Sequence, residues 1–297
     1  MQIIHGDRQL RAALESDPAL VVNDADEFEQ RYDELNLAFH AHFQDGVREH
    51  GVENAAFHKW RYCSLVREPL KGIVIDVGND KPFLSFYMHA LHPDADIKTI
   101  SFEIPQSPYD LYAVDIESEK FPFTAESADV VLFAEVLEHL WRDPSHAIYE
   151  INRVLRRDGV MYLTTPNPCE LHAITCILWQ ANPNQRSQIF RTLESGHVHL
   201  WSSPDLRLLI EGNGFAIDEM TSFDPYRYTQ KHDDIVKFVT SISPYPDLMG
   251  ECLLVRARKI QSIDRPAYPK EIFPDGVGVQ FEGAMRAFAL NTLMRSS

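Results

Sequence analysis

Two acids and one glycine follow short apolar runs in the middle of the chain, where they could bind a polar ligand. Asp76-Val77-Gly78 ends the run that begins at Ile73, and Glu103 ends the run that begins at Ile97. Glycine lets a backbone approach a ligand closely, and a carboxylate can accept hydrogen bonds from both hydroxyls of a ribose. Glu103 follows the glycine at a spacing near the roughly 20 residues typical of such an acid. A solvated glutamate at a strand end is the alternative.

A second acid lies before the next apolar run. Asp115 and Ile116 precede the turn Phe121–Asp129. An aspartate there could accept a hydrogen bond from the exocyclic amine of a purine, with the isoleucine packed on the ring. With Asp76, Gly78 and Glu103, these residues favour a site for an adenosine-type cofactor.

Histidines supply candidates for proton transfer. His139, His197 and His199 lie in segments that we expect near the ligand, and imidazole has a pKa close to neutrality. If the segment around residue 198 is extended, His197 and His199 point to the same side. With Glu135 or Glu138 they could then form a metal site of two histidines and one carboxylate. We favour the interpretation without a metal, in which His139, His197 and Glu135 are catalytic; a structural hydrogen bond is the alternative for His139.

The elements that must position these residues alternate between strand and helix. Apolar runs and helical patterns alternate from about residue 70 to 258, which predicts an α/β fold with a parallel sheet covered on both faces. We expect strands at 73–77, 97–103, 130–134, 160–164 and 251–257, and helices at 82–91, at 204–211 and from Pro144 to Gly159. Asp80 is placed to cap the first of these helices. In such sheets ligands bind beyond the carboxyl ends of the strands, where the candidate residues fall.

The two ends of the chain differ from this pattern. Residues 1–45 are acidic and contain a helical pattern with Phe28, Tyr32, Leu35 and Phe39 on one face, so we expect a helical extension. Packing on the main domain is the simplest role for this helix; a substrate lid or a homodimer contact is the alternative. Residues 169–196 are expected to be a cap insertion over the acceptor, and residues 259–297 a tail that packs on the domain.

The composition indicates which classes of binding partner and which cellular compartment to expect. The formal net charge is −16, with 44 acidic against 28 basic residues, whereas nucleic acid binding rests on basic surfaces. The four cysteines show no pair at metal-binding spacing, and no signal peptide or membrane-spanning apolar run is visible. We therefore expect a cytoplasmic protein that acts on a small molecule, with neither nucleic acid nor membrane as partner.

The middle of the chain resembles a known family. The motifs that carry the resemblance occur in one order: Phe121-Pro-Phe, Ala128-Asp-Val-Val-Leu, Glu135-Val-Leu-Glu-His-Leu, Asn152-Arg-Val-Leu, Asp158-Gly, Thr165-Pro-Asn, His197-Val-His and Ser203-Pro-Asp-Leu. Together they resemble class I S-adenosylmethionine-dependent methyltransferases, in particular the small-molecule group that includes ubiquinone-biosynthesis and sugar O-methyltransferases. The resemblance implies a doubly wound, Rossmann-like domain at 46–258 with a mostly parallel seven-stranded sheet.

The same resemblance implies roles for individual residues. Asp76 and Gly78 are assigned to the methionine part of S-adenosylmethionine and Glu103 to its ribose. Asp115 and Ile116 are assigned to the adenine. Ala134 and Glu135 are assigned to the neighbourhood of the sulfonium, where a carboxylate favours the positive charge.

One departure from the family pattern concerns the glycine turn. The family has three glycines after the aspartate at alternating positions, whereas this chain has Asp80 and Pro82 at the second and third. We expect an enzyme that methylates a small molecule, and the acceptor that we favour is an oxygen atom of a sugar or glycan-pathway intermediate. The alternative is a catalytically inactive, methyltransferase-like binding or scaffold protein. An NAD-dependent oxidoreductase would need a GxGxxG turn, which this sequence lacks.

Overall fold

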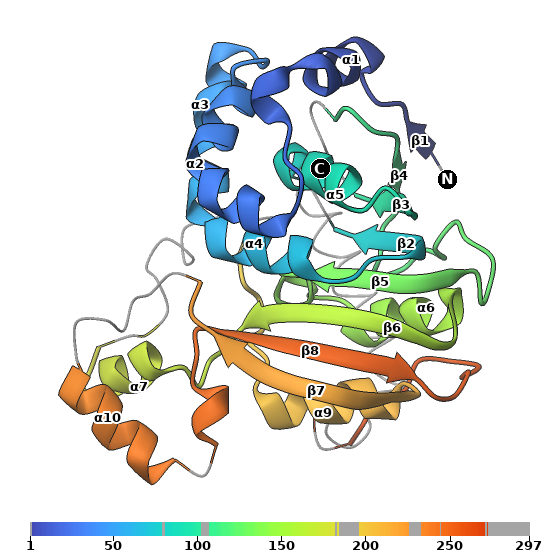
Figure 1. The fold of residues 1–297 in the computed structure, drawn as a ribbon. Coiled ribbons are helices and arrows are strands. Elements are labelled where there is room, and N and C mark those ends of the chain that lie inside the picture. The colour runs from blue at the N-terminus through green and yellow to red at the C-terminus, as the bar shows by residue number, and fades with distance from the viewer. Residues whose placement is uncertain are drawn as a thin grey trace, which may run out of the picture. The chain divides into compact units, whose positions relative to one another are not determined.

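The computed structural model describes residues 2–78, 81–101, 107–181, 183, 196–225, 233–243, 245–270 and 272. The chain forms two compact units. Figure 1 labels the helices and strands that belong to them. Unit 1 comprises Met1–Val114, Ala128–Leu132 and Asp224–Arg227, and unit 2 comprises Asp115–Ser127, Phe133–Phe223 and Tyr228–Ser297.

Unit 1 contains the amino-terminal helices and a sheet. Its elements in chain order are β1 (Gln2–Ile4), α1 (Arg8–Ser16), η1 (Pro18–Leu20), α2 (Ala25–His40), α3 (Asp45–Phe57), α4 (Lys59–Arg67), β2 (Gly72–Val77), α5 (Pro82–Leu91), β3 (Ala95–Ile100), β4 (Leu111–Ala113) and the first part of β5 (Ala128–Ala134). The strands lie in the order β1-β4-β3-β2-β5.

The sheet of unit 1 is parallel except at one edge. Strands β2 and β3, β3 and β4, and β2 and β5 pair in parallel, and β1 pairs antiparallel with β4. Val74, Ile75 and Val77 in the centre of this sheet are buried, as expected of a parallel strand covered on both faces. The predicted strand at 73–77 is confirmed, and the strand predicted at 97–103 ends earlier, at Ile100.

The predicted amino-terminal helix is confirmed as α2. Its apolar stripe is fully buried, and the ring of Phe28 lies 4.6 Å from that of Tyr87 on α5. Tyr32 packs edge-on against Phe83 of the same helix at 5.3 Å, and its hydroxyl donates to the carbonyl of Ala55 at 2.6 Å. Helix α2 is thus joined to α5 by an aromatic core within unit 1.

Helix α5 has the predicted bounds, but its cap position differs. Lys81 occupies that position and makes no capping hydrogen bond through its side chain. The predicted cap, Asp80, lies outside the described residues.

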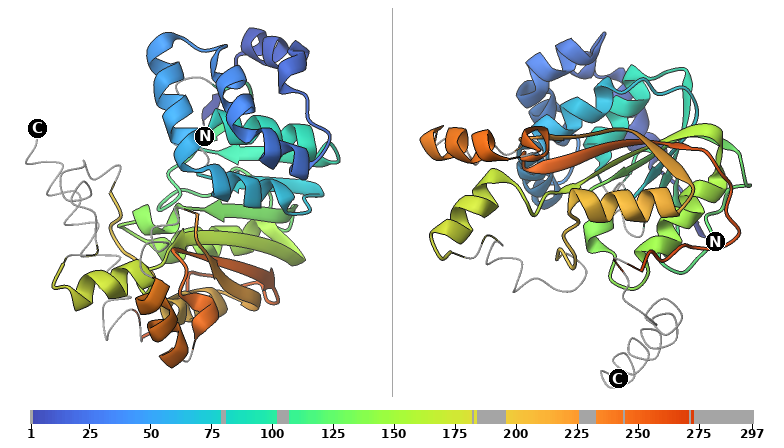
Figure 2. Two further views of the ribbon diagram at one scale, coloured as in Figure 1. Left: turned by 60° about the vertical axis from the view of Figure 1, so that its left-hand side comes forward. Right: turned by 90° about the horizontal axis from the view of Figure 1, so that it is seen from below.

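Unit 2 contains the end of β5 and the helices and strands that follow it in the chain. They are η2 (Leu137–His139), α6 (Pro144–Val154), β6 (Leu155–Pro166), α7 (Leu171–Leu178), α9 (Ser203–Gly212), β7 (Phe215–Phe223), α10 (Asp233–Ile242), η4 (Pro246–Leu248) and β8 (Cys252–Lys259). Strand β8 pairs antiparallel with both β6 and β7. Figure 2 shows α9 along β7 and α7 beside α10.

Helix α6 ends earlier than the sequence pattern predicts. Asp143 caps it by accepting a hydrogen bond from the backbone of His146, and the helix stops at Val154 rather than at Gly159. The backbone amides of Glu126 and Ser127 donate to the last carbonyls of the helix, at Arg153 and Val154. Because these carbonyls are satisfied from outside, the chain can turn directly into β6 without a glycine cap.

The described residues contain eight strands, not the seven expected for the fold. The additional edge strand, β1, comes from the extreme amino terminus, which we expected to be only helical. The α/β fold is otherwise as predicted. Among the residues that the structure describes, none of the helices has both the length and the apolar character that crossing a membrane requires.

Candidate functional site

The segment after β5 carries three of the candidate acids and histidines. Glu135 follows the strand directly, and Glu138 and His139 lie in the short helix η2. The backbone of Glu135 is left-handed, with φ 56°, and its amide donates to the carbonyl of Thr164 at 2.9 Å. A left-handed backbone costs a non-glycine residue about 1–2 kcal/mol, and such residues concentrate at functional sites. The chain is thus held in an unfavourable conformation at the point where the predicted site begins.

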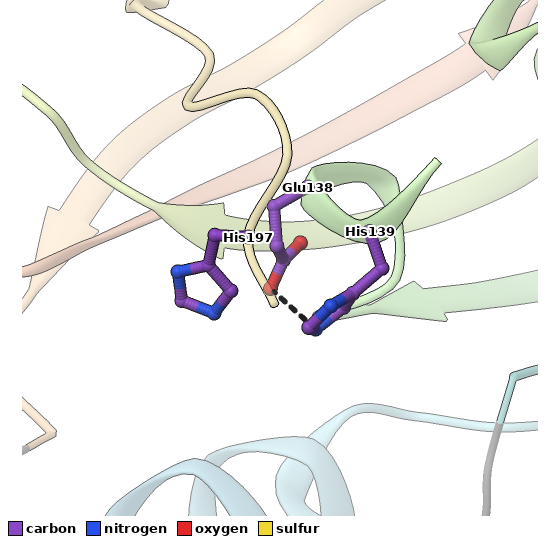
Figure 3. A group of neighbouring side chains, drawn as sticks. All are labelled: Glu138, His139 and His197. Atoms are coloured by element: carbon purple, nitrogen blue, oxygen red, sulfur yellow. Dashed lines mark ion pairs between the residues drawn. The ribbon is translucent and has the colours of Figure 1, made fainter. Parts of the chain in front are cut away.

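The side chains of Glu138, His139 and His197 come together in a cluster at η2. Nε2 of His139 lies 3.8 Å from Oε1 of Glu138, and the rings of His139 and His197 lie 5.0 Å apart in an edge-on arrangement. One nitrogen or oxygen of each residue lies within 4.8 Å of the other two. Figure 3 shows the carboxylate of Glu138 between the two imidazoles. Its side chain is only 1% exposed, whereas that of His139 is 34% exposed.

Hydrogen bonds of the two residues that flank His197 bring it to this cluster, 58 residues after His139 in the chain. Nδ1 of His139 lies 3.1 Å from the carbonyl oxygen of Gly196, and the amide of Val198 donates to the carbonyl of Glu138 at 2.8 Å. His197 lies between these two contacts. Thr165, near the end of β6, donates its hydroxyl to Oε2 of Glu138 at 3.1 Å. Three segments of unit 2 therefore meet at Glu138.

His199 does not join the cluster. It is exposed, and its ring packs against Trp201 at 4.5 Å. The segment 196–202 is not a strand, because it docks on η2 through single backbone contacts instead of pairing with a sheet. His199 is therefore not part of the group formed by Glu138, His139 and His197. The second imidazole of that group is His139, a neighbour of Glu138 in η2.

Asp115 makes a contact that the sequence did not indicate. Both of its carboxylate oxygens lie 2.6 Å from one guanidinium nitrogen of Arg142. Burial would raise the pKa of Asp115, but hydrogen bonds from Arg142, Ser118 and the amide of Glu117 outweigh burial and lower it. The buried carboxylate of Glu117 accepts from the amide of Arg142 at 2.6 Å. No sequence spacing signals this pairing, because Arg142 is 27 residues from Asp115.

The remaining cofactor candidates fall in different places. In unit 1, Asp76 is buried near the end of β2, and Gly78 has φ 81° with its amide donating to the carbonyl of Ile100 at 2.8 Å. Glycine adopts this left-handed conformation without the steric cost that a side chain would add. In unit 2, Ile116 and Ala134 are half-buried. Glu103 lies outside the described residues, as do Asn79 and Asp80 of the altered turn.

Several motif residues beside the site have structural contacts. Arg153 donates to the carbonyls of Phe121 and Phe123, both at 2.9 Å, and so shapes the turn before β5. The side-chain amide of Asn167 donates to the carbonyls of Leu248 and Gly250. These polar side chains hold loops together and are not placed with the cluster.

The expected cap insertion is described only in part. Helix α7 is present, and Ile177, Leu178 and Trp179 at its end are exposed. Most of residues 182–195 lies outside the described residues, so the cap over the acceptor stays a prediction.

A family model described as "Methyltransferase domain" matches residues 93–163. This segment includes Glu138 and His139 but begins after the altered glycine turn. No curated protein gives a significant match to the chain.

Solved structures that are similar to this chain include three from microorganisms. One is a chain from the complex between the Trm112 methyltransferase activator of Haloferax volcanii and a protein assigned as a methyltransferase; it has 18% identity and a TM-score of 0.49, and the match covers 81% of this chain and 100% of that one. An S-adenosylmethionine-dependent methyltransferase from Mesorhizobium loti has 14% identity and a TM-score of 0.44, with 68% and 98% covered. One from Archaeoglobus fulgidus has 13% identity and a TM-score of 0.48, with 69% and 94% covered.

Proposed function

We propose that the chain is a class I S-adenosylmethionine-dependent methyltransferase, as the methyltransferase-domain model over residues 93–163 supports, and that it methylates a hydroxyl of a small molecule. The acceptor that we favour is a sugar, a nucleotide-sugar or another glycan-pathway intermediate. The choice of a sugar rests on the resemblance of the motifs between residues 115 and 167, and the choice of oxygen on the chemistry of the cluster.

The observation that carries the proposal is the convergence of Glu138, His139 and His197 just after β5. In methyl transfer the S–CH3 bond of the cofactor breaks as the O–CH3 bond forms, and the hydroxyl must lose its proton. Two imidazoles and a carboxylate within 4.8 Å of one another form a group that can take up that proton. Ligands bind beyond the carboxyl ends of strands in this fold, which is where η2 begins.

Within this proposal, the cofactor residues keep the roles that the resemblance implies. Asp76 and Gly78 bind the methionine part and Glu103 the ribose. Asp115 and Ile116 bind the adenine. Ala134 and Glu135 lie at the sulfonium, and the left-handed backbone of Glu135 supports a functional role for that residue.

The proposal can be tested with the full chain and labelled cofactor. S-adenosylmethionine with a labelled methyl group is incubated with a panel of free sugars and nucleoside-diphosphate sugars, and the products are separated by mass spectrometry. We expect one class of hydroxyl-bearing sugar to acquire the label. Label that enters only amines or carboxylates would refute O-methylation.

Cofactor binding separates an enzyme from an inactive relative. Titration calorimetry should give a measurable dissociation constant for S-adenosylmethionine despite the altered turn at residues 79–82. If no binding occurs at millimolar cofactor, the alternative of a methyltransferase-like scaffold is correct.

A further inference from the structure

We propose that Glu138, His139 and His197 bind a divalent first-row transition metal ion such as Zn²⁺, Mn²⁺ or Fe²⁺. The ligand atoms are Oε1 of Glu138, Nε2 of His139 and one ring nitrogen of His197. Of the residues that the structure describes, these three form the one group of this kind.

The chemical types of the ligands point to this class of ion. Two imidazoles with one carboxylate suit zinc and iron, and leave further coordination positions open, whereas Mg²⁺ and Ca²⁺ prefer oxygen ligands alone. Oε1 of Glu138 and Nε2 of His139 are already 3.8 Å apart. Ligands at about 2.1 Å from a tetrahedral ion lie about 3.4 Å from each other, so a small contraction completes the arrangement.

The contacts behind the cluster are those that orient metal ligands. A metal-binding histidine characteristically donates its second ring nitrogen to a backbone carbonyl, which fixes the tautomer and directs the other nitrogen at the ion. Nδ1 of His139 lies 3.1 Å from the carbonyl oxygen of Gly196, so it carries the proton and Nε2 presents a lone pair. The carboxylate is held in the same way, since Thr165 donates to Oε2 of Glu138 and leaves Oε1 toward His139.

The third ligand is placed by the backbone on both sides of it. Gly196 and Val198 are each hydrogen-bonded to η2, so the position of His197 relative to Glu138 is set before any ion binds. A site that is already assembled loses less conformational entropy when the ion arrives.

The use of the ion follows from its open positions, and this step rests on the proposed function. A hydroxyl that coordinates a divalent ion has a lowered pKa, as water bound to zinc does. An ion that bound the acceptor oxygen would ease the loss of its proton to solvent water as the O–CH3 bond forms and the S–CH3 bond of the cofactor breaks. His139 and His197 would then act as ligands of the ion and not as the groups that take up the proton.

Binding of the ion is tested without any methyl acceptor. Full-length protein treated with a chelator and then freed of it is titrated with Zn²⁺ by calorimetry and with Co²⁺ by visible absorption. We expect one tight equivalent for the wild type and for the control His199→Gln, which changes an exposed neighbour outside the cluster. His197→Gln and Glu138→Gln should weaken binding at least about 100-fold. If the wild type binds no stoichiometric ion, or if His197→Gln binds as tightly as the wild type, the site is refuted.

A second variant keeps all three ligands and tests one contact behind them. Thr165→Val removes the hydrogen bond to Glu138 but leaves all three ligands, and should weaken Zn²⁺ about 10-fold, the lower end of the effect of outer contacts. Circular dichroism of each variant before titration shows that the fold is intact. Unchanged affinity for Zn²⁺ in Thr165→Val would show that the hydrogen bond from Thr165 does not orient Glu138 for the ion.

The role of the ion is tested separately from its binding. Chelated protein should still bind S-adenosylmethionine but lose methyl transfer, and added Mn²⁺ or Zn²⁺ should restore it. Full transfer by the chelated protein would overturn the role in the reaction. If the ion binds as expected but no sugar is methylated with or without it, the proposed function fails while the metal site stands.

Discussion

Asp115 and Glu138, two acidic residues of unit 2, have side-chain partners of different chemistry. Asp115 is held by the permanent charge of Arg142, with both oxygens at 2.6 Å from one nitrogen. Glu138 is more deeply buried and meets two imidazoles, whose charge depends on protonation or on a bound ion. A carboxylate beside a guanidinium stabilises the fold, whereas one beside imidazoles can take part in proton or metal chemistry. The partner of an acid therefore decides its role.

The largest effect should come from removing an imidazole of the cluster. His197→Ala should lower the rate of methyl transfer about 100-fold or more and leave the affinity for S-adenosylmethionine nearly unchanged. Steady-state rates with the labelled sugar and calorimetry with the cofactor measure the two quantities. His199→Ala is the matched control and should retain full turnover. Equal losses in both variants would remove the distinction between these histidines.

A cofactor variant tests the assignment of the acids to the cofactor. Glu103→Ala should weaken S-adenosylmethionine by about 1.5–3 kcal/mol if its carboxylate accepts from the ribose hydroxyls. Asp115→Asn should also weaken it if the aspartate binds adenine as well as Arg142. Unchanged affinity in Asp115→Asn, measured by calorimetry, would leave that residue with its structural contact alone.

Breaking the pair with Arg142 should reduce stability rather than turnover. Arg142→Ala leaves Asp115 and the buried Glu117 without the guanidinium, and should lower the free energy of unfolding by about 1–3 kcal/mol, less than for a fully buried pair because both side chains are partly exposed. Urea denaturation measures this change. His197→Gln, at the half-buried cluster edge, should change stability by less than about 0.5 kcal/mol. A larger loss of stability in His197→Gln than in Arg142→Ala would contradict the structural role given to the pair of Asp115 and Arg142.

The smallest effect concerns pH. The pKa of Asp115 is lowered in the folded protein, so its contribution to stability is complete above the pKa of an unfolded aspartate, about 3.9. That contribution is lost as the pH falls through the folded pKa. Unfolding of the wild type between pH 5 and the acid limit should therefore be steeper than that of Asp115→Asn, measured by thermal denaturation. Parallel curves would show that Arg142 does not stabilise the charged form.

The sequence predicted the elements better than it predicted their contacts. Helix α5 and the stripe of α2 were recognised because their apolar spacing depends only on local geometry. The end of α6 was misjudged, since it depends on amides of residues 126 and 127 that close its last turn from outside. The edge strand β1 was missed because three residues carry too little pattern to indicate a strand.

For the site, the sequence singled out Glu135, Glu138, His139 and His197 by type and position. From the sequence we favour His197 over His199, which lies two residues further along the same segment, but with no contact on which to base that choice. In the structure, the carbonyl of Gly196 accepts a hydrogen bond from His139, and the amide of Val198 donates to Glu138. These two contacts place His197, and not His199, in the cluster. The sequence also gave no sign that Arg142 would bind Asp115.

What the sequence by itself determined is the α/β pattern and the motifs of a methyltransferase, because periodicity and short motifs are local properties. Only the tertiary structure decided which carboxylate meets imidazoles and which meets a guanidinium. Those contacts join residues 27 positions apart at Asp115 and about twice as far apart at Glu138 and His197. They depend on how loops dock at the ends of strands, and no local pattern records that docking.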